Sequence, residues 1–252
     1  MPSLYDLIII GTGAAGTSAA TRARRLGAER VAMVERGPIW GTCVNTGCIP
    51  SKFLLAVGDL AWYRNYGHTG LEMTARLDLG QVIGEKRDLI LRLRDRKARR
   101  LFGELGVELV EGTARFVSPH EIEVDGRTME ARKFVIATGS SPSVPDVEGI
   151  AGVPYLTNVG ALELGEVPES LVVIGGRALG LEFAQIFAHF GSRVTLLQRS
   201  PRIIPEEEPE ISLALEDALK AEGVDIRTGA GLLRVRLEGD GIGVVARVKG
   251  TA

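Results

Sequence analysis

Residues 5–16 read YDLIIIGTGAAG, an apolar run that leads directly into a glycine-rich turn. The turn has the spacing G-x-G-x-x-G, formed by Gly11, Gly13 and Gly16. Alanine-rich residues 14–26 predict a helix after the turn, and residues 30–35 predict a second strand that ends at Glu35. Strand, glycine turn, helix and terminal acidic residue together predict a βαβ unit that binds a dinucleotide.

Each position of this motif has a physical role in dinucleotide binding. Gly11 permits the tight turn, Gly13 lets the backbone approach a diphosphate, and Gly16 lets helix and strand pack closely. The helix N-terminus offers free N–H groups and a positive dipole end, beginning at Ala14 and Ala15. Glu35 would hold the ribose hydroxyls. The alternative is a glycine turn without a ligand, and the surrounding strand, helix and acidic residue argue against it.

The composition is that of a globular protein with small partners. The 252 residues carry 30 basic and 32 acidic side chains, a formal net charge of -2 that attracts neither nucleic acid nor an anionic membrane. One run of cations is interpreted as a solvated helix face, and it comprises Arg92, Arg94, Arg96, Lys97, Arg99 and Arg100. No apolar run reaches the roughly 18 residues of a membrane span. The first strand begins too near Met1 for a signal peptide, so we expect a cytoplasmic protein.

The βαβ pattern of residues 5–35 recurs at residues 170–198. A strand, a helix and a second strand are predicted there, and the turn after the first strand contains Gly175, Gly176 and Gly180. The two patterns are separated by a linker with Pro142, Pro145 and Gly149. The predicted fold class is therefore α/β, with two Rossmann-like dinucleotide-binding modules.

The remaining pattern fills in the elements around these modules. Helices are predicted at residues 51–63, 78–105 and 209–222. Short strands are predicted at residues 107–110, 114–117, 121–124, 133–137, 224–226, 232–237 and 242–248.

The only two cysteines, Cys43 and Cys48, lie in GTCVNTGCIPSK, residues 41–52. Gly47 gives the intervening chain a flexible point, so that the two thiols can meet. The helix predicted to follow places its positive end near Cys48, and Lys52 adds a cation, and both lower a thiol pKa. The pair is therefore predicted to perform redox exchange.

A zinc site and a structural disulfide are the alternatives. Zinc usually takes four ligands, and the available histidines are distant in sequence, at His68, His120 and His189. A disulfide across so short a loop would constrain the unfolded chain little, and the cytoplasm would reduce it. No metal site is predicted.

The cysteine segment resembles that of the class I pyridine nucleotide-disulfide oxidoreductases, the family of dihydrolipoamide dehydrogenase, glutathione reductase and mercuric reductase. Ala137-Thr138-Gly139-Ser140 resembles the family sequence at the end of the first FAD segment. The resemblance implies an FAD-binding domain at residues 1–145, incomplete without a later return segment. It also implies a truncated NAD(P)-binding domain at residues 146–252, inserted into the first.

The resemblance implies roles for individual residues as well. Cys48 matches the thiol that faces the flavin, and Cys43 matches the thiol that exchanges with substrate. Lys52 matches a lysine near the flavin ring, and Glu182 matches its acidic partner. Further FAD contacts are implied at Gly41, Thr42, Ala114, Ala137, Thr138 and Gly139. Trp40 stands where the family usually has glycine.

The second module departs from the family pattern at two places. Arg177 takes the position of the second fingerprint glycine, so its side chain must point outward or bind phosphate itself. A module that no longer binds nucleotide is the alternative. Gln198 stands where an acidic residue would favour NADH, and Arg199 and Arg202 suit a 2′-phosphate. NADPH is therefore expected, with NADH as the alternative.

Three segments resemble mercuric reductase more than dihydrolipoamide dehydrogenase, at residues 154–157, 181–185 and 198–202. The expected function is electron transfer from NAD(P)H through FAD and the cysteines to Hg(II) or a disulfide. Dihydrolipoamide dehydrogenase or another disulfide reductase is one alternative, and a flavin- or nucleotide-binding sensor without catalysis is another. The resemblance also implies a homodimer, formed through a C-terminal domain that this sequence does not contain.

Overall fold

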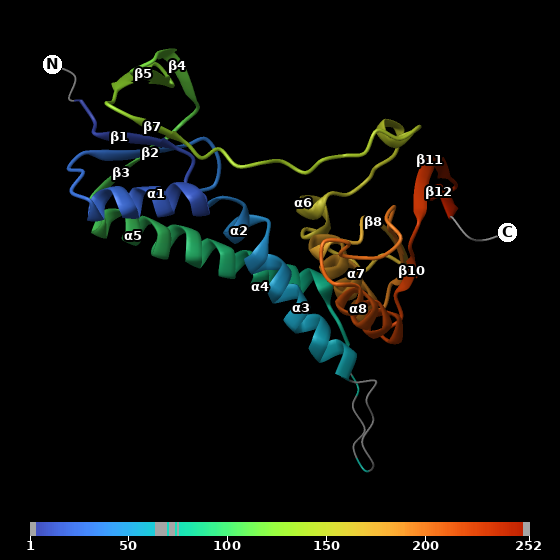
Figure 1. The fold of residues 1–252 in the computed structure, drawn as a ribbon. Helices are drawn as coiled ribbons and strands as arrows, with labels where there is room; N and C mark the ends of the chain where they lie inside the picture. The colour runs from blue at the N-terminus through green and yellow to red at the C-terminus, as the bar shows by residue number, and fades with distance from the viewer. Residues whose placement is uncertain (1–3, 64–69, 71–73, 75, 249–252) are drawn as a thin grey trace. The chain divides into compact units, whose positions relative to one another are not determined.

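The computed structural model describes residues 4–63, 70, 74 and 76–248. The chain forms two compact units, Met1–Pro50 with Glu85–Ser141 and Ser51–Gly84 with Pro142–Ala252 (Figure 1). The later change of unit falls at the start of the predicted linker, whereas residues 51–84 group with the second unit.

The first unit is built on a parallel sheet with strand order β3-β2-β1-β7. Its strands are β1 (Leu7–Ile10), β2 (Val31–Glu35), β3 (Val107–Glu111) and β7 (Phe134–Ile136). Residues 31–34 are buried in succession, as a strand covered on both faces requires. Ile10 pairs with both Val34 and Ile136, so the carboxyl ends of these strands lie along one edge.

Helices cover one face of this sheet and a small antiparallel sheet covers the other (Figure 1). The helices are α1 (Ala14–Arg25) and α5 (Arg99–Glu104), and the small sheet consists of β4 (Ala114–Ser118), β5 (Glu121–Val124) and β6 (Arg127–Glu130). Phe102 of α5 shares a core with Ile9, while Ile122 of β5 shares another with Ile8. Successive residues of β1 thus enter different cores, because strand side chains alternate between faces.

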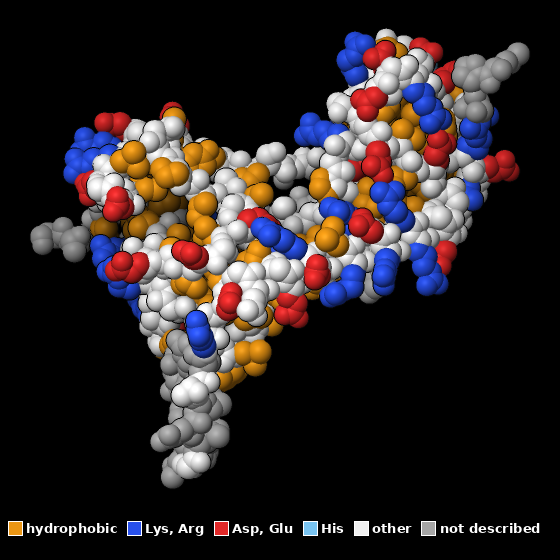
Figure 2. All heavy atoms as spheres, turned by 180° about the vertical axis from the view of Figure 1, so that it is seen from behind, with side chains coloured by type: hydrophobic (Ala, Val, Ile, Leu, Met, Phe, Trp, Pro, Cys, Tyr) orange, Lys and Arg blue, Asp and Glu red, His pale blue; other side chains and the backbone are white. Residues whose placement is uncertain are grey.

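The predicted helix at residues 78–105 is confirmed as one helical run with a change of winding inside it. It consists of α4 (Leu79–Leu91), a π-helix η1 (Arg92–Ala98) and α5. Cations of this run pair locally, Arg99 with Glu111 at 2.8 Å and Arg100 with Glu104 at 2.7 Å. Charges of both signs are interspersed over the face drawn in Figure 2, so no extended basic surface forms there.

The second unit repeats the βαβ arrangement, as the sequence predicted. Its parallel sheet has the order β10-β9-β8. The elements are β8 (Ser170–Ile174), α7 (Ala178–Phe190), β9 (Arg193–Leu197), α8 (Pro209–Ala221) and β10 (Asp225–Arg227), followed by the antiparallel pair β11 (Ala230–Glu238) and β12 (Gly241–Val248). Phe187 of α7 and Leu196 of β9 are fully buried in its core.

Helix α3 (Cys48–Tyr63) contacts α7 at two levels. Lys52 hydrogen-bonds to Glu182, and Nδ1 of His189 lies 3.4 Å from Oδ1 of Asp59. The two contacts are therefore seven positions apart in each helix. At the second contact a Cβ on Gly58 would lie 3.2 Å from Cβ of His189, so a glycine permits the close approach.

The elements that sequence patterns missed are short. They are α2 (Gly41–Asn45), β6, the 3₁₀ turn η2 (Ile150–Gly152) and α6 (Asn158–Ala161). Such segments hold too few residues for a periodic pattern to emerge. None of the helices in the described part of the chain is long and apolar enough to cross a membrane.

Candidate functional site

The first glycine turn lies at the carboxyl edge of the parallel sheet, between β1 and α1. Gly11 has φ 107°, and a Cβ there would lie 2.2 Å from the carbonyl oxygen of Ala137. A Cβ on Gly16 would lie 2.0 Å from the carbonyl oxygen of Gly11, so only glycine lets α1 pack this closely. Among the described atoms, a Cβ on Gly13 would come within 4 Å only of Gly41, at 3.9 Å. The N-terminus of α1 is therefore open to a diphosphate.

Glu35 is hydrogen-bonded to the glycine turn itself. Its Oε2 accepts from the backbone N–H of Thr12 at 3.0 Å and from Oγ1 of Thr12 at 2.7 Å. Its Oε1 accepts from the N–H of Gly37 at 3.0 Å. The carboxylate thus fixes the turn, and its contact with a ribose stays a prediction. Thr12 is fully buried, and the glycine spacing of the motif places no requirement on it.

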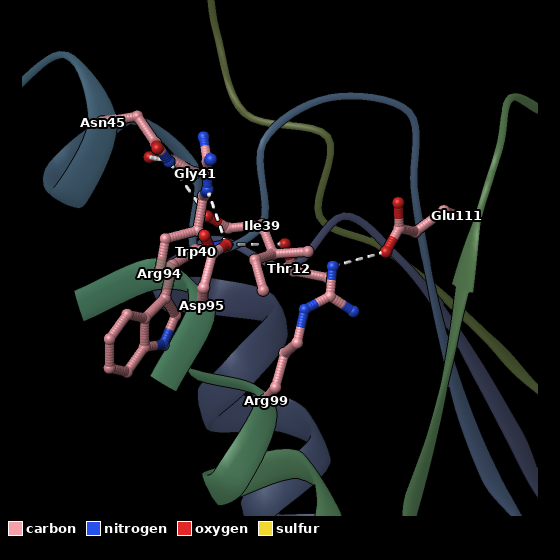
Figure 3. Close-up of polar contacts among 9 residues, drawn as sticks. All are labelled: Thr12, Ile39, Trp40, Gly41, Asn45, Arg94, Asp95, Arg99 and Glu111. Atoms are coloured by element: carbon pink, nitrogen blue, oxygen red, sulfur yellow. Dashed lines mark hydrogen bonds and ion pairs between the residues drawn. The ribbon is translucent and has the colours of Figure 1, made fainter. Parts of the chain in front are cut away.

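Residues 39–45, which include Cys43, are tied to the same turn (Figure 3). The N–H of Trp40 donates to Oγ1 of Thr12 at 3.0 Å, and Trp40 has φ 76°. Nδ2 of Asn45 donates to the carbonyl oxygens of Ile39 at 2.9 Å and Gly41 at 2.8 Å. A left-handed backbone favours glycine, the residue that the family resemblance implies at this position. Neither Thr12 nor Asn45 was singled out from sequence.

The remaining first-unit residues with an implied FAD contact lie at or near this edge. The N–H of Ala137 donates to the carbonyl oxygen of Ile10 at 2.8 Å, directly after β7. Thr138 and Gly139 follow and are exposed, and Ala114 begins β4 shortly after β3 ends. Ligands of open parallel sheets bind beyond the carboxyl ends of the strands.

Cys43 and Cys48 are reduced thiols brought together by the bend between α2 and α3. A side-chain hydrogen bond to Cys48, then desolvation and the Cys48 charge, raise the pKa of the Cys43 thiol. A Cβ on Gly47 would lie 3.0 Å from the carbonyl oxygen of Thr42 and 3.3 Å from Cα of Cys43. Gly47 thus permits close packing of the chain at this bend. Helix α3 starts at Cys48 itself, ahead of the predicted start.

The predicted contact between Lys52 and Glu182 is present. Lys52 donates a short hydrogen bond to Glu182, joining α3 to α7. The side chain of Glu182 is 25% exposed and that of Lys52 is 63% exposed. Glu182 is therefore half-buried, as its apolar sequence neighbours predicted, and it holds the ammonium group in one place.

The second glycine turn reproduces the first. Gly175 has φ 109°, and a Cβ on Gly180 would lie 1.9 Å from the carbonyl oxygen of Gly175. The N–H of Gly176 donates to Oε1 of Gln198 at 3.1 Å, as the N–H of Thr12 does to Glu35 in the first turn. The turn geometry is thus intact although Arg177 replaces a glycine.

The three arginines near this turn differ in their contacts. Arg177 caps α7 and forms an ion pair with Glu206. The guanidinium of Arg202 donates to the carbonyl oxygens of Pro205 at 2.7 Å and Glu207 at 2.9 Å, so it fixes its own loop. Arg199 is exposed and forms no ion pair with any described residue. Of the two cations expected at a 2′-phosphate, Arg199 is the one free to bind it.

Within the described ranges, no group of at least three His, Cys, Asp or Glu side chains is arranged to hold a metal ion. His189 contacts Glu222 at 3.1 Å in the second unit, and His120 follows β4. His68 lies outside the described residues.

The chain is similar in sequence to two mercuric reductases and to a dihydrolipoyl dehydrogenase. Mercuric reductases of Bacillus cereus and Streptomyces lividans are each 44% identical to this chain, covering 94% of it and 38% and 52% of their own lengths. The dihydrolipoyl dehydrogenase of Thermus scotoductus is 39% identical, covering 96% of this chain and 52% of its own. The chain thus spans about half the length of these relatives, or less.

The fold is also shared with solved structures. The HOCl-induced flavoprotein disulfide reductase RclA from Escherichia coli matches with a TM-score of 0.82 and 30% identity, over 98% of this chain and 54% of that one. Its Cu(II) complex matches with a TM-score of 0.81. The family described as pyridine nucleotide-disulphide oxidoreductase, whose members use FAD and NAD(P)H, matches residues 5–251. The chain therefore belongs to the pyridine nucleotide-disulphide oxidoreductase family.

Proposed function

We propose that this chain binds FAD and NADPH and carries the redox-active cysteines of an oxidoreductase that reduces a soft metal ion or a disulfide. The observation that carries the proposal is the placement of α2. Helix α2 begins at Gly41, beside Gly13 of the first turn. It also contains Cys43, whose side chain forms a hydrogen bond with Cys48. A dithiol beside a dinucleotide turn is what electron transfer between flavin and thiols requires.

The first unit has the features that FAD needs. Gly13 leaves space for a diphosphate at the N-terminus of α1, and Thr138 and Gly139 are exposed near the same sheet edge. Oδ1 of Asn45 is buried without a partner among the described residues, so a bound group that carries a donor would satisfy it. When bound, FAD supplies the two-electron chemistry that links a nicotinamide dinucleotide to a dithiol.

The two cysteines have separate tasks in this proposal. With a disulfide substrate, the Cys43 thiolate attacks one sulfur, forms a mixed disulfide and releases the first thiol. The Cys48 thiolate then attacks Cys43, which closes the Cys43–Cys48 disulfide and releases the second thiol. The substrate gains two electrons and two protons, and the cysteine pair loses them. With Hg(II), both thiolates act as soft ligands for the soft ion.

We favour Hg(II) as the substrate because the mercuric reductases are 44% identical to the chain and the dihydrolipoyl dehydrogenase is 39% identical. A disulfide such as lipoamide is the second candidate. NADPH is favoured over NADH because Gln198 replaces an acidic residue and Arg199 is a free cation. We also propose that the complete protein is a homodimer, as its family resemblance implies.

The test uses the complete, FAD-loaded protein. NADPH oxidation is measured with Hg(II), lipoamide and glutathione disulfide in turn, for the wild type and for Cys43→Ser and Cys48→Ser. We expect Hg(II)-dependent oxidation that both variants abolish. Undiminished turnover in either variant would refute the cysteine mechanism. Flavin binding without turnover on any acceptor would instead favour the sensor.

A further inference from the structure

The side chain of Arg177 stands where a dinucleotide turn usually has no side chain. In the first turn the corresponding residue is Gly13, which leaves the space ahead of α1 open. Arg177 caps α7 with extended backbone, φ −98° and ψ 176°, and its side chain is 73% exposed. Its guanidinium forms an ion pair with one carboxylate, that of Glu206.

Glu206 lies on a loop that is anchored to the same glycine turn. The N–H of Ile204 donates to the carbonyl oxygen of Gly176 at 2.8 Å, and the neighbouring Ile203 is fully buried. Arg202 donates to the carbonyl oxygens of the residues on either side of Glu206. These hydrogen bonds fix the backbone around Glu206. The position of this loop brings the Glu206 carboxylate into contact with Arg177.

We propose that the guanidinium of Arg177 binds the diphosphate of the nicotinamide dinucleotide and that Glu206 is the anion it leaves when the dinucleotide arrives. This inference rests on the proposed function, in which the second unit binds NADPH. A guanidinium pairs with phosphate oxygens in a bidentate way, and such charge-assisted bonds are among the stronger ones. An ion pair with both partners exposed contributes little, so exchanging one anion for another costs little.

The arrangement explains how the turn can tolerate the missing glycine. The usual glycine lets the backbone N–H groups approach the diphosphate directly. Here a side chain would reach the diphosphate, and the carboxylate of Glu206 would compete with it. Removing the guanidinium should therefore weaken binding of a diphosphate, whereas removing the Glu206 charge should strengthen it.

The experiment uses the complete, FAD-loaded protein and isothermal titration calorimetry. ADP-ribose is the probe that contains the diphosphate, and adenosine 2′-monophosphate is the probe that lacks it. The variants are Arg177→Gln and Glu206→Gln. Matched controls are Arg193→Gln and Glu169→Gln. These two residues form an exposed ion pair at 2.7 Å, and Arg193 begins β9, away from the glycine turn.

We expect Arg177→Gln to weaken ADP-ribose binding by about tenfold, the effect of losing one charge-assisted pair. Glu206→Gln should tighten it severalfold, and neither variant should change adenosine 2′-monophosphate binding more than the controls do. Unchanged or tighter ADP-ribose binding in Arg177→Gln overturns the inference, and so does unchanged or weaker binding in Glu206→Gln. A wild type that binds neither NADPH nor ADP-ribose overturns the proposed NADPH site as well.

Discussion

Gln198 accepts a hydrogen bond from the backbone N–H of Gly176 through its side-chain oxygen, at 3.1 Å. Glu35 makes the corresponding bond with Thr12 at 3.0 Å in the first unit. The two units thus use the same contact to fix their glycine turns, once with a charged acceptor and once with a neutral one. The neutral acceptor can do this structural task without placing a negative charge near a phosphate.

Replacing Gln198 with Glu should therefore shift cofactor preference while preserving the turn. A carboxylate can accept the same bond from Gly176, but it repels a 2′-phosphate and hydrogen-bonds a free ribose hydroxyl. We expect NADPH to bind about tenfold more weakly and NADH to bind no more weakly than before. Dissociation constants for both cofactors on the FAD-loaded protein measure this, with Arg193→Gln as a remote control. An equal loss for NADPH and NADH would show that the substitution had damaged the turn.

At position 40, glycine should stabilise the protein more than alanine does, the reverse of the order expected inside a helix. Its φ of 76° lies in the left-handed region, which costs a residue with Cβ about 1–2 kcal/mol. The free energy of unfolding of Trp40→Gly should therefore exceed that of Trp40→Ala by about 1 kcal/mol. Both variants lose the indole, so the comparison isolates the backbone. At Val44 in α2 the order should reverse, and urea unfolding of the four variants checks both signs.

Gly47→Ala should hinder formation of the Cys43–Cys48 disulfide. The new Cβ would lie 3.0 Å from the carbonyl oxygen of Thr42, so the backbone of α2 would have to shift by a few tenths of an ångström. We expect slower loss of free thiols when the reduced protein is treated with a mild oxidant. Gly84→Ala is the control, because a Cβ there would meet no described atom within 4 Å. Equal oxidation rates in the two variants would argue against a packing role for Gly47.

The alkylation of Cys43 should depend on its partner thiol. The hydrogen bond with Cys48, desolvation and the Cys48 charge all raise the pKa of Cys43, so its reactive thiolate forms only at higher pH than in an ordinary cysteine. In Cys48→Ala the side-chain hydrogen bond and the charge of Cys48 are both absent. The pH at half-maximal iodoacetamide labelling of Cys43, followed by peptide mass spectrometry, should therefore fall. A midpoint that stays or rises would contradict the assigned cause.

Sequence patterns predicted those features that nearby residues determine. Both βαβ units follow from an apolar run, a glycine turn and a periodic helix, and the cysteine segment identified the family. The contact of Lys52 with Glu182 came from resemblance rather than from pattern, because the two residues are far apart in the chain. Thr12 and Asn45 were missed for a related reason. Their importance lies in hydrogen bonds to Trp40, Ile39 and Gly41, which become visible only when the loop is folded.

The paired contacts between α3 and α7 limit how this part of the chain can change in length. Inserting one residue between Lys52 and Asp59 would turn the rest of α3 by about 100° and carry Asp59 away from His189. The same insertion in α7 between Glu182 and His189 would separate the same partners. An insertion or deletion in either helix alone would therefore keep the first contact and lose the second.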